Sequence, residues 1–489
     1  MATIRVPSDY PTISAAITAA SPGDTIIVDP GVYNEAITIN KALTLLGAGA
    51  DINPVSVGRP GGESTIDSQF AVTIAASDII FNGFEVRNFR YGINIPAASF
   101  PAPNYTVQNI TIKYNWMHAT NATIGFNAEP GLLRNLVISH NIISVNNVSP
   151  GGDDYALAAI GFSSGATATP TYENIKIVSN EIANLSSEGA YGLFAGADPG
   201  AYLINKMEIS CNHFINVSTG ANYNIGNILD GKFSNNVVDN AGGSIGIQSG
   251  VVSGNTFRNG GSLSLWGTEF GFTRPSANLC VVNNEFMDEI TGNGLRIRLG
   301  ALANTIAVHN NAFRNSGIAP STPPDYTEGY LIRNTGMGTL DATLNWWDSS
   351  CGPTGNTGGL AGSIIVSPWI TAYFDASAKQ APFCCWPLST FMTTRPGFWP
   401  RYISSLCYVG KSSFMRNECV ALPSQVSFND GNAGGIPVEF DLAGRKCQVN
   451  TQPGGIACLC FEHLSPGVYP LTVSAIGFSD RQNITVTNS

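Results

Sequence analysis

The sequence predicts an all-β protein whose residues 1–370 form a right-handed parallel β-helix with an N-terminal helical cap. Three observations favour this fold. A chain of 489 residues is too long for one ordinary globular core and suits a solenoid that grows by repetition. Charged residues make up only 12% of the chain whereas Gly reaches 53 residues, so the surface is polar but nearly uncharged. The third and decisive observation is an internal repeat.

The repeat consists of an apolar residue, two residues, an Asn, one residue and another large apolar residue. Asn tolerates the left-handed conformation of a tight bend, and stacked Asn side chains can hydrogen-bond from one coil to the next. We therefore expect an Asn ladder at a turn, with the flanking apolar residues stacked in the core. Its members are Asn115, Asn141, Asn180, Asn212, Asn236, Asn255, Asn284, Asn311 and Asn345.

The N-terminus reads as the cap that a solenoid requires. An Ala-rich amphipathic helix starts at Pro11-Thr12-Ile13 and runs through Ala20. It can cover the open end of the core and block edge-to-edge pairing. The strand-like segments that follow read as the first coils.

Particular segments resemble a known superfamily. The run Val6–Ile13, the run Gly23–Ile26 and the segments Gly31–Glu35 and Leu43–Gly47 resemble the opening of pectin-lyase-like β-helix proteins. Asn345-Trp346-Trp347-Asp348 with Ser367-Pro368-Trp369-Ile370 is similar to the closing coil of many bacterial surface β-helix proteins. This resemblance implies a fold and a habitat outside the cytosol, and it implies no activity.

The last quarter of the chain lacks the Asn repeat and has a different composition. Residues 371–406 are irregular and rich in Pro and aromatic residues, which indicates a disulfide-tied connector. Residues 407–489 contain alternating strand-like segments, which predict a small β-sandwich that resembles bacterial immunoglobulin-like modules.

The ten Cys are unevenly distributed. An even number in a loop-rich region favours disulfides and an extracellular or cell-surface location, and the absence of a Cys-x2-Cys pair argues against zinc. The pairing cannot be assigned from spacing. The eight disulfide candidates are Cys351, Cys384, Cys385, Cys407, Cys419, Cys447, Cys458 and Cys460.

Charge and hydropathy narrow the range of partners. The formal net charge of −10, without a basic run, argues against nucleic acid and anionic membranes. No apolar stretch approaches the ~20 residues that span a bilayer. The chain enters structured sequence at Met1, so we expect a secretion signal to be absent or removed.

Few residues suggest catalysis. Arg296 and Arg298 are expected on one strand face with Asp288 and Glu289 nearby in sequence, where they could hold a uronate carboxylate and serve a lyase. A surface ion pair between neighbouring coils is the alternative interpretation.

Asp153 and Asp154 could form an acid pair or a calcium site, although Asp beside Gly is also ordinary turn composition. We expect no metal or other cofactor; calcium is allowed, but nothing indicates it. His118, His140, His213 and His309 are interpreted as turn residues. The superfamily's polygalacturonase, pectin methylesterase and alginate epimerase motifs are missing.

Seven Asn-x-Ser/Thr sequons allow glycosylation without indicating it, because this composition produces them by chance. They are at Asn104, Asn109, Asn121, Asn147, Asn184, Asn216 and Asn483.

Together these features predict a secreted structural or surface protein that self-assembles, head-to-tail, into an extracellular filament or surface layer. The expected partner is another copy, with glycans as a further candidate. The alternatives are a carbohydrate-active enzyme, either a lyase or a hydrolase of an acidic polysaccharide, and a glycan-binding adhesin or tailspike.

Overall fold

The computed structural model is nearly all β and contains long parallel sheets, as predicted. It describes residues 1–57, 61–95, 106–119, 124–128, 132–146, 157–162, 171–185, 190–195, 202–215, 221–240, 242–268, 274–287, 294–313, 330–345, 347, 360–366, 370–374, 390–393, 403–408, 413–415, 420–428, 437–450, 456–461, 464–475 and 478–487.

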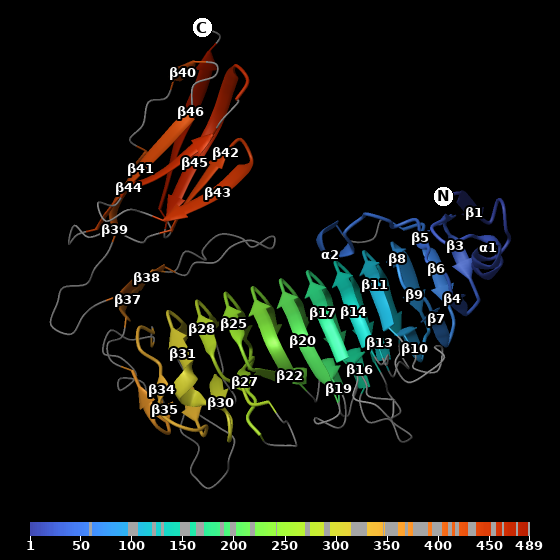
Figure 1. Cartoon of the computed structure of the whole chain (residues 1–489), viewed down its shortest axis with the longest axis horizontal. Coiled ribbons are helices and arrows are strands. Elements are labelled where there is room, and N and C mark those ends of the chain that lie inside the picture. The colour runs from blue at the N-terminus through green and yellow to red at the C-terminus, as the bar shows by residue number, and fades with distance from the viewer. Residues whose placement is uncertain are drawn as a thin grey trace. The chain divides into compact units, whose positions relative to one another are not determined.

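Most strands form a parallel β-helix with three walls, and each strand pairs with its equivalent in the next coil (Figure 1). The first wall comprises β1 (Thr3–Val6), β2 (Thr25–Val28), β5 (Thr44–Leu46), β8 (Ile79–Asn82), β11 (Thr106–Lys113), β14 (Leu132–Ser139), β17 (Thr171–Val178), β20 (Leu203–Ser210), β25 (Gly250–Ser253), β28 (Leu279–Val282), β31 (Ile306–His309), β34 (Leu340–Asp341) and β36 (Ile364–Ile365).

The second wall is an 11-stranded sheet of its own. It comprises β3 (Gly31–Tyr33), β6 (Ser64–Asp67), β9 (Phe84–Arg87), β12 (Trp116–Ala119), β15 (Ile142–Val145), β18 (Glu181–Asn184), β21 (His213–Ile215), β23 (Val237–Asp239), β26 (Thr256–Arg258), β29 (Glu285–Phe286) and β32 (Ala312–Phe313).

The third wall is joined to the first by β22 (Ala221–Ser234), whose two halves pair with both walls. Its other strands are β4 (Ile37–Ile39), β7 (Phe70–Ile74), β10 (Tyr91–Ile95), β13 (Ile124–Ala128), β16 (Leu157–Phe162), β19 (Ala190–Ala195), β24 (Gly243–Ile247), β27 (Leu263–Leu265), β30 (Leu295–Ile297), β33 (Ile332–Asn334) and β35 (Leu360–Ala361).

The nine repeat Asn form one buried stack at the corner between the first and second walls. From Asn115 to Asn311, each backbone N–H and each side-chain NH₂ donates to the Oδ1 of the Asn in the next coil, as from Asn212 to Asn236 at 3.0 and 3.1 Å. The same NH₂ donates back to a carbonyl of the preceding coil, such as Ile177 O at 2.8 Å. Asn345, the last member, donates to backbone carbonyls such as Val308 O instead of to another Asn. All nine side chains are at most 1% exposed. The ladder therefore satisfies polar groups that burial would otherwise penalise.

The conformational reason that we gave for Asn at these positions is wrong. The left-handed residue is the one before each ladder Asn, such as Tyr114 (φ 56°), His140 (φ 57°) and Cys211 (φ 58°). Asn is required in the ladder because its amide both donates and accepts along the stack.

A second, exposed ladder does use left-handed Asn residues. Asn174 donates to Asn135 at 2.8 Å, Asn135 to Asn109 at 2.9 Å, and Asn109 to Asp78 at 2.7 Å. All four residues have φ between 53° and 61°. The three Asn residues each stand six residues before a member of the buried corner stack, a spacing that sequence reasoning could have detected.

Aromatic side chains stack in the core of the last coils. The Phe257, Phe286, Phe313 and Trp347 rings follow one another at centroid distances of 4.6, 4.8 and 4.9 Å. All four are fully buried. A single coil could not bury such a ring, so the stack couples neighbouring coils energetically.

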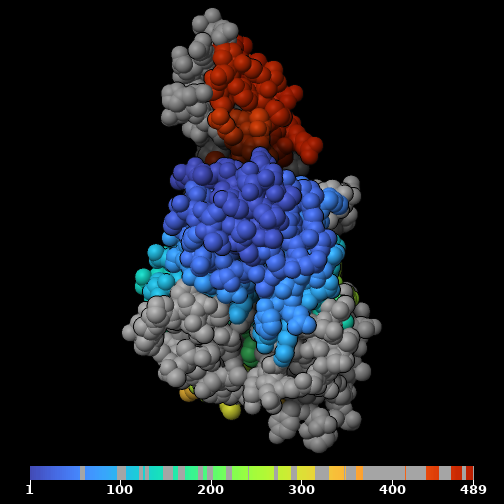
Figure 2. All heavy atoms as spheres, turned by 90° about the vertical axis from the view of Figure 1, so that its right-hand side faces the viewer, coloured from blue at the N-terminus to red at the C-terminus, as the bar shows by residue number. Residues whose placement is uncertain are grey.

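The N-terminal end is closed by α1 (Ile13–Ala19), which buries Ile13, Ala16 and Ile17. The Thr12 hydroxyl accepts a hydrogen bond from Ala15 N at 3.1 Å, which is an N-cap. At the other end of α1, Lys41 Nζ donates to three carbonyls at 2.8 to 3.0 Å. Figure 2 looks onto this end, where the N-terminal residues (blue) form a continuous surface. A further short helix, α2 (Pro54–Val57), follows β5.

The C-terminal unit is a separate compact unit built from a five-stranded and a three-stranded sheet. A buried cluster that includes Phe440, Leu471, Val473 and Ile484 fills it. The larger sheet contains β40 (Ser413–Met415), β42 (Pro437–Leu442), β43 (Arg445–Asn450), β45 (Gly467–Ala475) and β46 (Phe478–Thr487), and the smaller contains β39 (Ile403–Tyr408), β41 (Val420–Phe428) and β44 (Ile456–Phe461).

Two expectations for this region need correction. The predicted irregular connector contains an antiparallel pair, β37 (Ile370–Phe374) with β38 (Thr390–Thr393), because its apolar and aromatic residues can also pair as strands. Cys447, a disulfide candidate, is an exposed free thiol on the edge strand β43. The side chains of the other seven candidates lie outside the described residues.

Candidate functional site

Arg296 and Arg298 alternate with the buried Leu295 and Ile297 along β30 and the residue that follows it. Arg296 lies in β30 between the buried Leu295 and Ile297, in register with Arg333 of the next coil. The Arg298 guanidinium lies 4.2 Å from the centre of the Trp266 ring. Such stacking holds the cation against an aromatic face.

The four acidic candidates lie outside the described residues: Asp288, Glu289, Asp153 and Asp154. Among the residues that are described, no group of three or more His, Cys, Asp or Glu side chains is arranged to hold a metal ion.

Three histidines that were interpreted as turn residues lie on strands, and each contacts a carboxylate of a neighbouring coil. The Nε2–carboxylate distances are 2.8 Å for His118 with Glu85, 4.0 Å for His213 with Asp239, and 3.1 Å for His309 with Asp341. Only His140 occupies a left-handed turn position. Sequence reasoning missed these pairs because the loops between coils vary in length.

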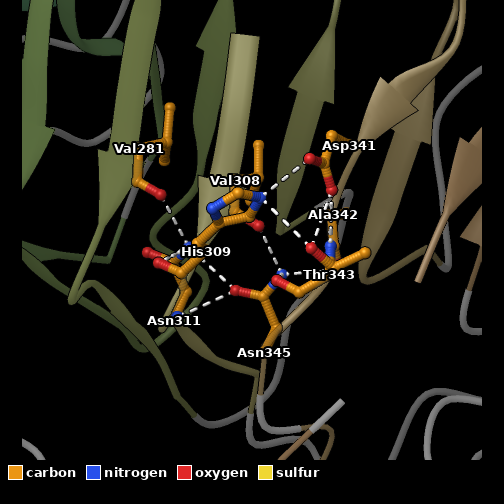
Figure 3. Close-up of polar contacts among 8 residues, drawn as sticks. All are labelled: Val281, Val308, His309, Asn311, Asp341, Ala342, Thr343 and Asn345. Atoms are coloured by element: carbon orange, nitrogen blue, oxygen red, sulfur yellow. Dashed lines mark hydrogen bonds and ion pairs between the residues drawn. The ribbon is translucent and has the colours of Figure 1, made fainter. Parts of the chain in front are cut away.

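Figure 3 shows the pair nearest the C-terminal end of the β-helix. His309 Nε2 contacts Asp341 Oδ2 and, at 3.3 Å, the Thr343 hydroxyl, which itself donates to Asp341 Oδ1 at 2.8 Å. Partial burial raises the pKa of Asp341, but the hydrogen bonds from Thr343 and His309 outweigh it and lower the pKa overall. Asn311 and Asn345 of the buried Asn ladder adjoin this pair, so the cluster ties the last coils together.

The most elaborate polar group, here called the Glu85 cluster, lies on the outer side of the second wall. It comprises Thr65, Glu85, Trp116 and His118 from three consecutive coils. Glu85 is 7% exposed and accepts hydrogen bonds from the Thr65 hydroxyl at 2.5 Å and from His118 Nε2 at 2.8 Å. The His118 ring stacks on Trp116 with a centroid distance of 4.2 Å.

Glu85 keeps its charge in this setting. Burial raises its pKa, but the hydrogen bonds from Thr65 and His118 lower it by more. The charged, buried carboxylate of Glu85 fixes the orientation of the His118 ring. Catalytic and metal-binding histidines are held by carboxylates in this way, and so are histidines in purely structural pairs. Beside it, Arg87 Nε donates to Asp67 Oδ2 at 2.9 Å.

Three further ion pairs join neighbouring coils. Arg258 contacts Asp239 at 2.9 Å, Arg134 contacts Glu173 at 2.6 Å, and Lys232 contacts Glu208 at 2.9 Å. Each partner stands on the next strand of the same wall.

The Asn residues of the predicted glycosylation sequons differ in their exposure. Asn184 is fully buried and donates to Tyr191 O at 3.0 Å, so it cannot accept a glycan in the folded chain, contrary to our expectation. Asn109 is engaged on both sides in the exposed ladder, whereas Asn483 is exposed on β46. Asn104, Asn121, Asn147 and Asn216 lie outside the described residues.

No family model, no curated protein and no solved structure matches this chain. No helix in the described part of the chain is long and apolar enough to cross a membrane.

Proposed function

We propose that this protein is an extracellular structural element of the pectin-lyase-like superfamily: a rigid β-helix rod that carries a small β-sandwich and self-associates into a filament or surface layer. The resemblance of Val6–Ile13 and the closing-coil segments supports the superfamily. The low charge content supports a surface that packs against other copies.

One observation carries the structural role. Many of the ionic side chains on the described strands contact an opposite charge in the next coil, as in Arg258–Asp239 and Lys232–Glu208. Exposed ion pairs of this kind contribute only up to about 1 kcal/mol each to stability. Their charges are nevertheless paired within the β-helix itself. An enzyme would be expected to keep a convergent set of acids and bases directed at a substrate.

The hydrogen bonds of the edge strand β1 at the N-terminal end determine which kind of contact another copy of the chain can make there. The Arg5 N–H of β1 donates to Asp9 Oδ2 at 2.7 Å, and its carbonyl accepts from Asp9 N at 3.0 Å. These bonds occupy edge groups that could otherwise pair with a strand of another chain. We infer that head-to-tail association uses side-chain contacts at this end.

The test is sedimentation velocity combined with electron microscopy of the full chain over a range of concentrations. We expect the mean particle mass to rise with concentration and end-to-end fibres to form, because a non-closing contact propagates. A parallel series with reductant separates true association from oxidation of the exposed thiols Cys280 and Cys447. A monomer at every concentration would contradict assembly.

A second candidate, glycan binding or processing, is favoured by the Glu85 cluster, which presents a Trp116–His118 platform beside the Arg87–Asp67 pair. Binding to an array of acidic and neutral glycans, followed by depolymerisation assays, tests this. Trp116→Ala should abolish binding, whereas Phe70→Ala, which removes an exposed aromatic ring from the third wall, serves as the matched control. Equal effects of both changes, or no bound glycan, would remove this candidate.

A further inference from the structure

Three side chains with complementary chemistry meet near the N-terminal end of the β-helix. Lys113 ends β11 and is in register with Asn82, which ends β8. Asp51 reaches both from the loop after β5. Its Oδ1 accepts hydrogen bonds from Lys113 Nζ at 2.8 Å and from Asn82 Nδ2 at 3.2 Å. Its backbone N–H donates to Asn82 Oδ1 at 3.2 Å.

We propose that Lys113 and Asn82 react to form an intramolecular isopeptide bond, with Asp51 as the proton carrier. Lys113 Nζ attacks Cγ of Asn82, the new N–C bond forms, and the bond from Cγ to Nδ2 breaks. The Lys113 ammonium loses two protons in all, and the leaving group departs as ammonium. No oxidant, metal or other reactant is required.

The contacts give Asp51 two separate roles. Its Oδ1 lies between the attacking and the leaving nitrogen, so it can accept a proton from Lys113 and deliver it to Nδ2. The hydrogen bond from Lys113 lowers the pKa of Asp51, so the carboxylate is ionised and holds the lysine beside the amide. Lys113 attacks after it has released one proton, and Asp51 accepts the second as the new N–C bond makes the attacking nitrogen acidic. The Asp51 N–H points at Asn82 Oδ1, where negative charge develops during the attack.

The surroundings hold the reactants in place. Cross-strand register keeps the Lys113 and Asn82 backbones adjacent, which replaces an intermolecular encounter by an intramolecular one. Asn82 is only 1% exposed, so its amide is shielded from bulk water. Asp51 is held at φ 62°, a left-handed conformation that Asp tolerates.

The bond would join β8 to β11 covalently and close the chain between them into a loop. Such a cross-link constrains the unfolded chain as a disulfide does, but it resists reduction. It would therefore lock two neighbouring coils close to the capped end of the rod.

The experiment is intact-mass spectrometry of the purified full chain after prolonged incubation at neutral pH. We expect a mass lower than the sequence mass by one ammonia, and a branched peptide that contains both Lys113 and Asn82 after digestion. Lys113→Arg keeps a cation beside Asp51 but offers no nucleophilic amine, so it should show the full sequence mass. Asp51→Asn keeps the shape and removes the proton acceptor, so it should abolish or greatly slow the mass loss.

Two results would overturn the proposal. One is the unchanged sequence mass in a chain whose circular dichroism shows it to be folded, which would leave the three residues as a hydrogen-bonded ion pair. The other is conversion of Asn82 to a carboxylate through attack by the N–H of Gly83. That reaction raises the mass slightly and gives no branched peptide.

Discussion

Replacing Asn212 by Ala is expected to destabilise the β-helix by about 3 kcal/mol or more, because the change leaves several buried polar groups without partners. Asn212 Oδ1 accepts from Asn180 N and Nδ2, both at 3.0 Å, and its Nδ2 donates to Ile177 O and Asn236 Oδ1. Chemical denaturation followed by circular dichroism measures the loss. Hydrogen exchange would locate it in β17, β20 and β22.

The matched control is Asn135→Gly in the exposed ladder. This change also removes an amide with two ladder partners, but water can replace them, and Gly accepts the left-handed φ of 53° at that position. We expect a loss below about 1 kcal/mol. Similar losses for the two variants would show that burial is not what makes the ladder stabilising.

The buried ladder also shows how far the sequence determines this fold. Its nine Asn could be predicted because each coil repeats the same local demand, a polar group that bonds to the coils on both sides. The left-handed residue before it could be predicted only in part. Asn235, Gly254, Asn283 and Asn310 are residue types that favour this conformation, whereas Tyr114, His140, Ser179, Cys211 and Leu344 are not. The bend of the backbone imposes the left-handed conformation at this position, and the hydrogen bonds of the buried Asn ladder offset its conformational strain.

The candidate site was far less predictable. Side chains on the outside of a β-helix meet residues of other coils, and the number of loop residues between coils varies. Glu85 and His118 are 33 residues apart, and their contact depends on the register between β9 and β12. Composition showed that charges were few, whereas only the structure shows that many of them, such as Arg258 and Asp239, are paired across coils.

Replacing Phe286 by Ala is expected to have the largest effect of any single core substitution proposed for this protein, a loss of about 4 kcal/mol. Its ring is fully buried between Phe257 at 4.6 Å and Phe313 at 4.8 Å, so the change removes a large apolar group and two stacking contacts at once. Denaturant unfolding and hydrogen exchange measure the loss.

Two further variants separate the causes of that loss. Phe286→Leu keeps most of the volume and should cost roughly half as much, since the cavity is small but the stacking is gone. Phe70→Ala removes the same side chain from an exposed position, where the residue is 56% exposed, and should cost little. Because coils contact only their neighbours, hydrogen exchange should accelerate most around β26, β29 and β32. Uniform acceleration from β1 to β36 would instead mean that the rod unfolds as one cooperative unit, in which case the stacked core carries stability along its whole length.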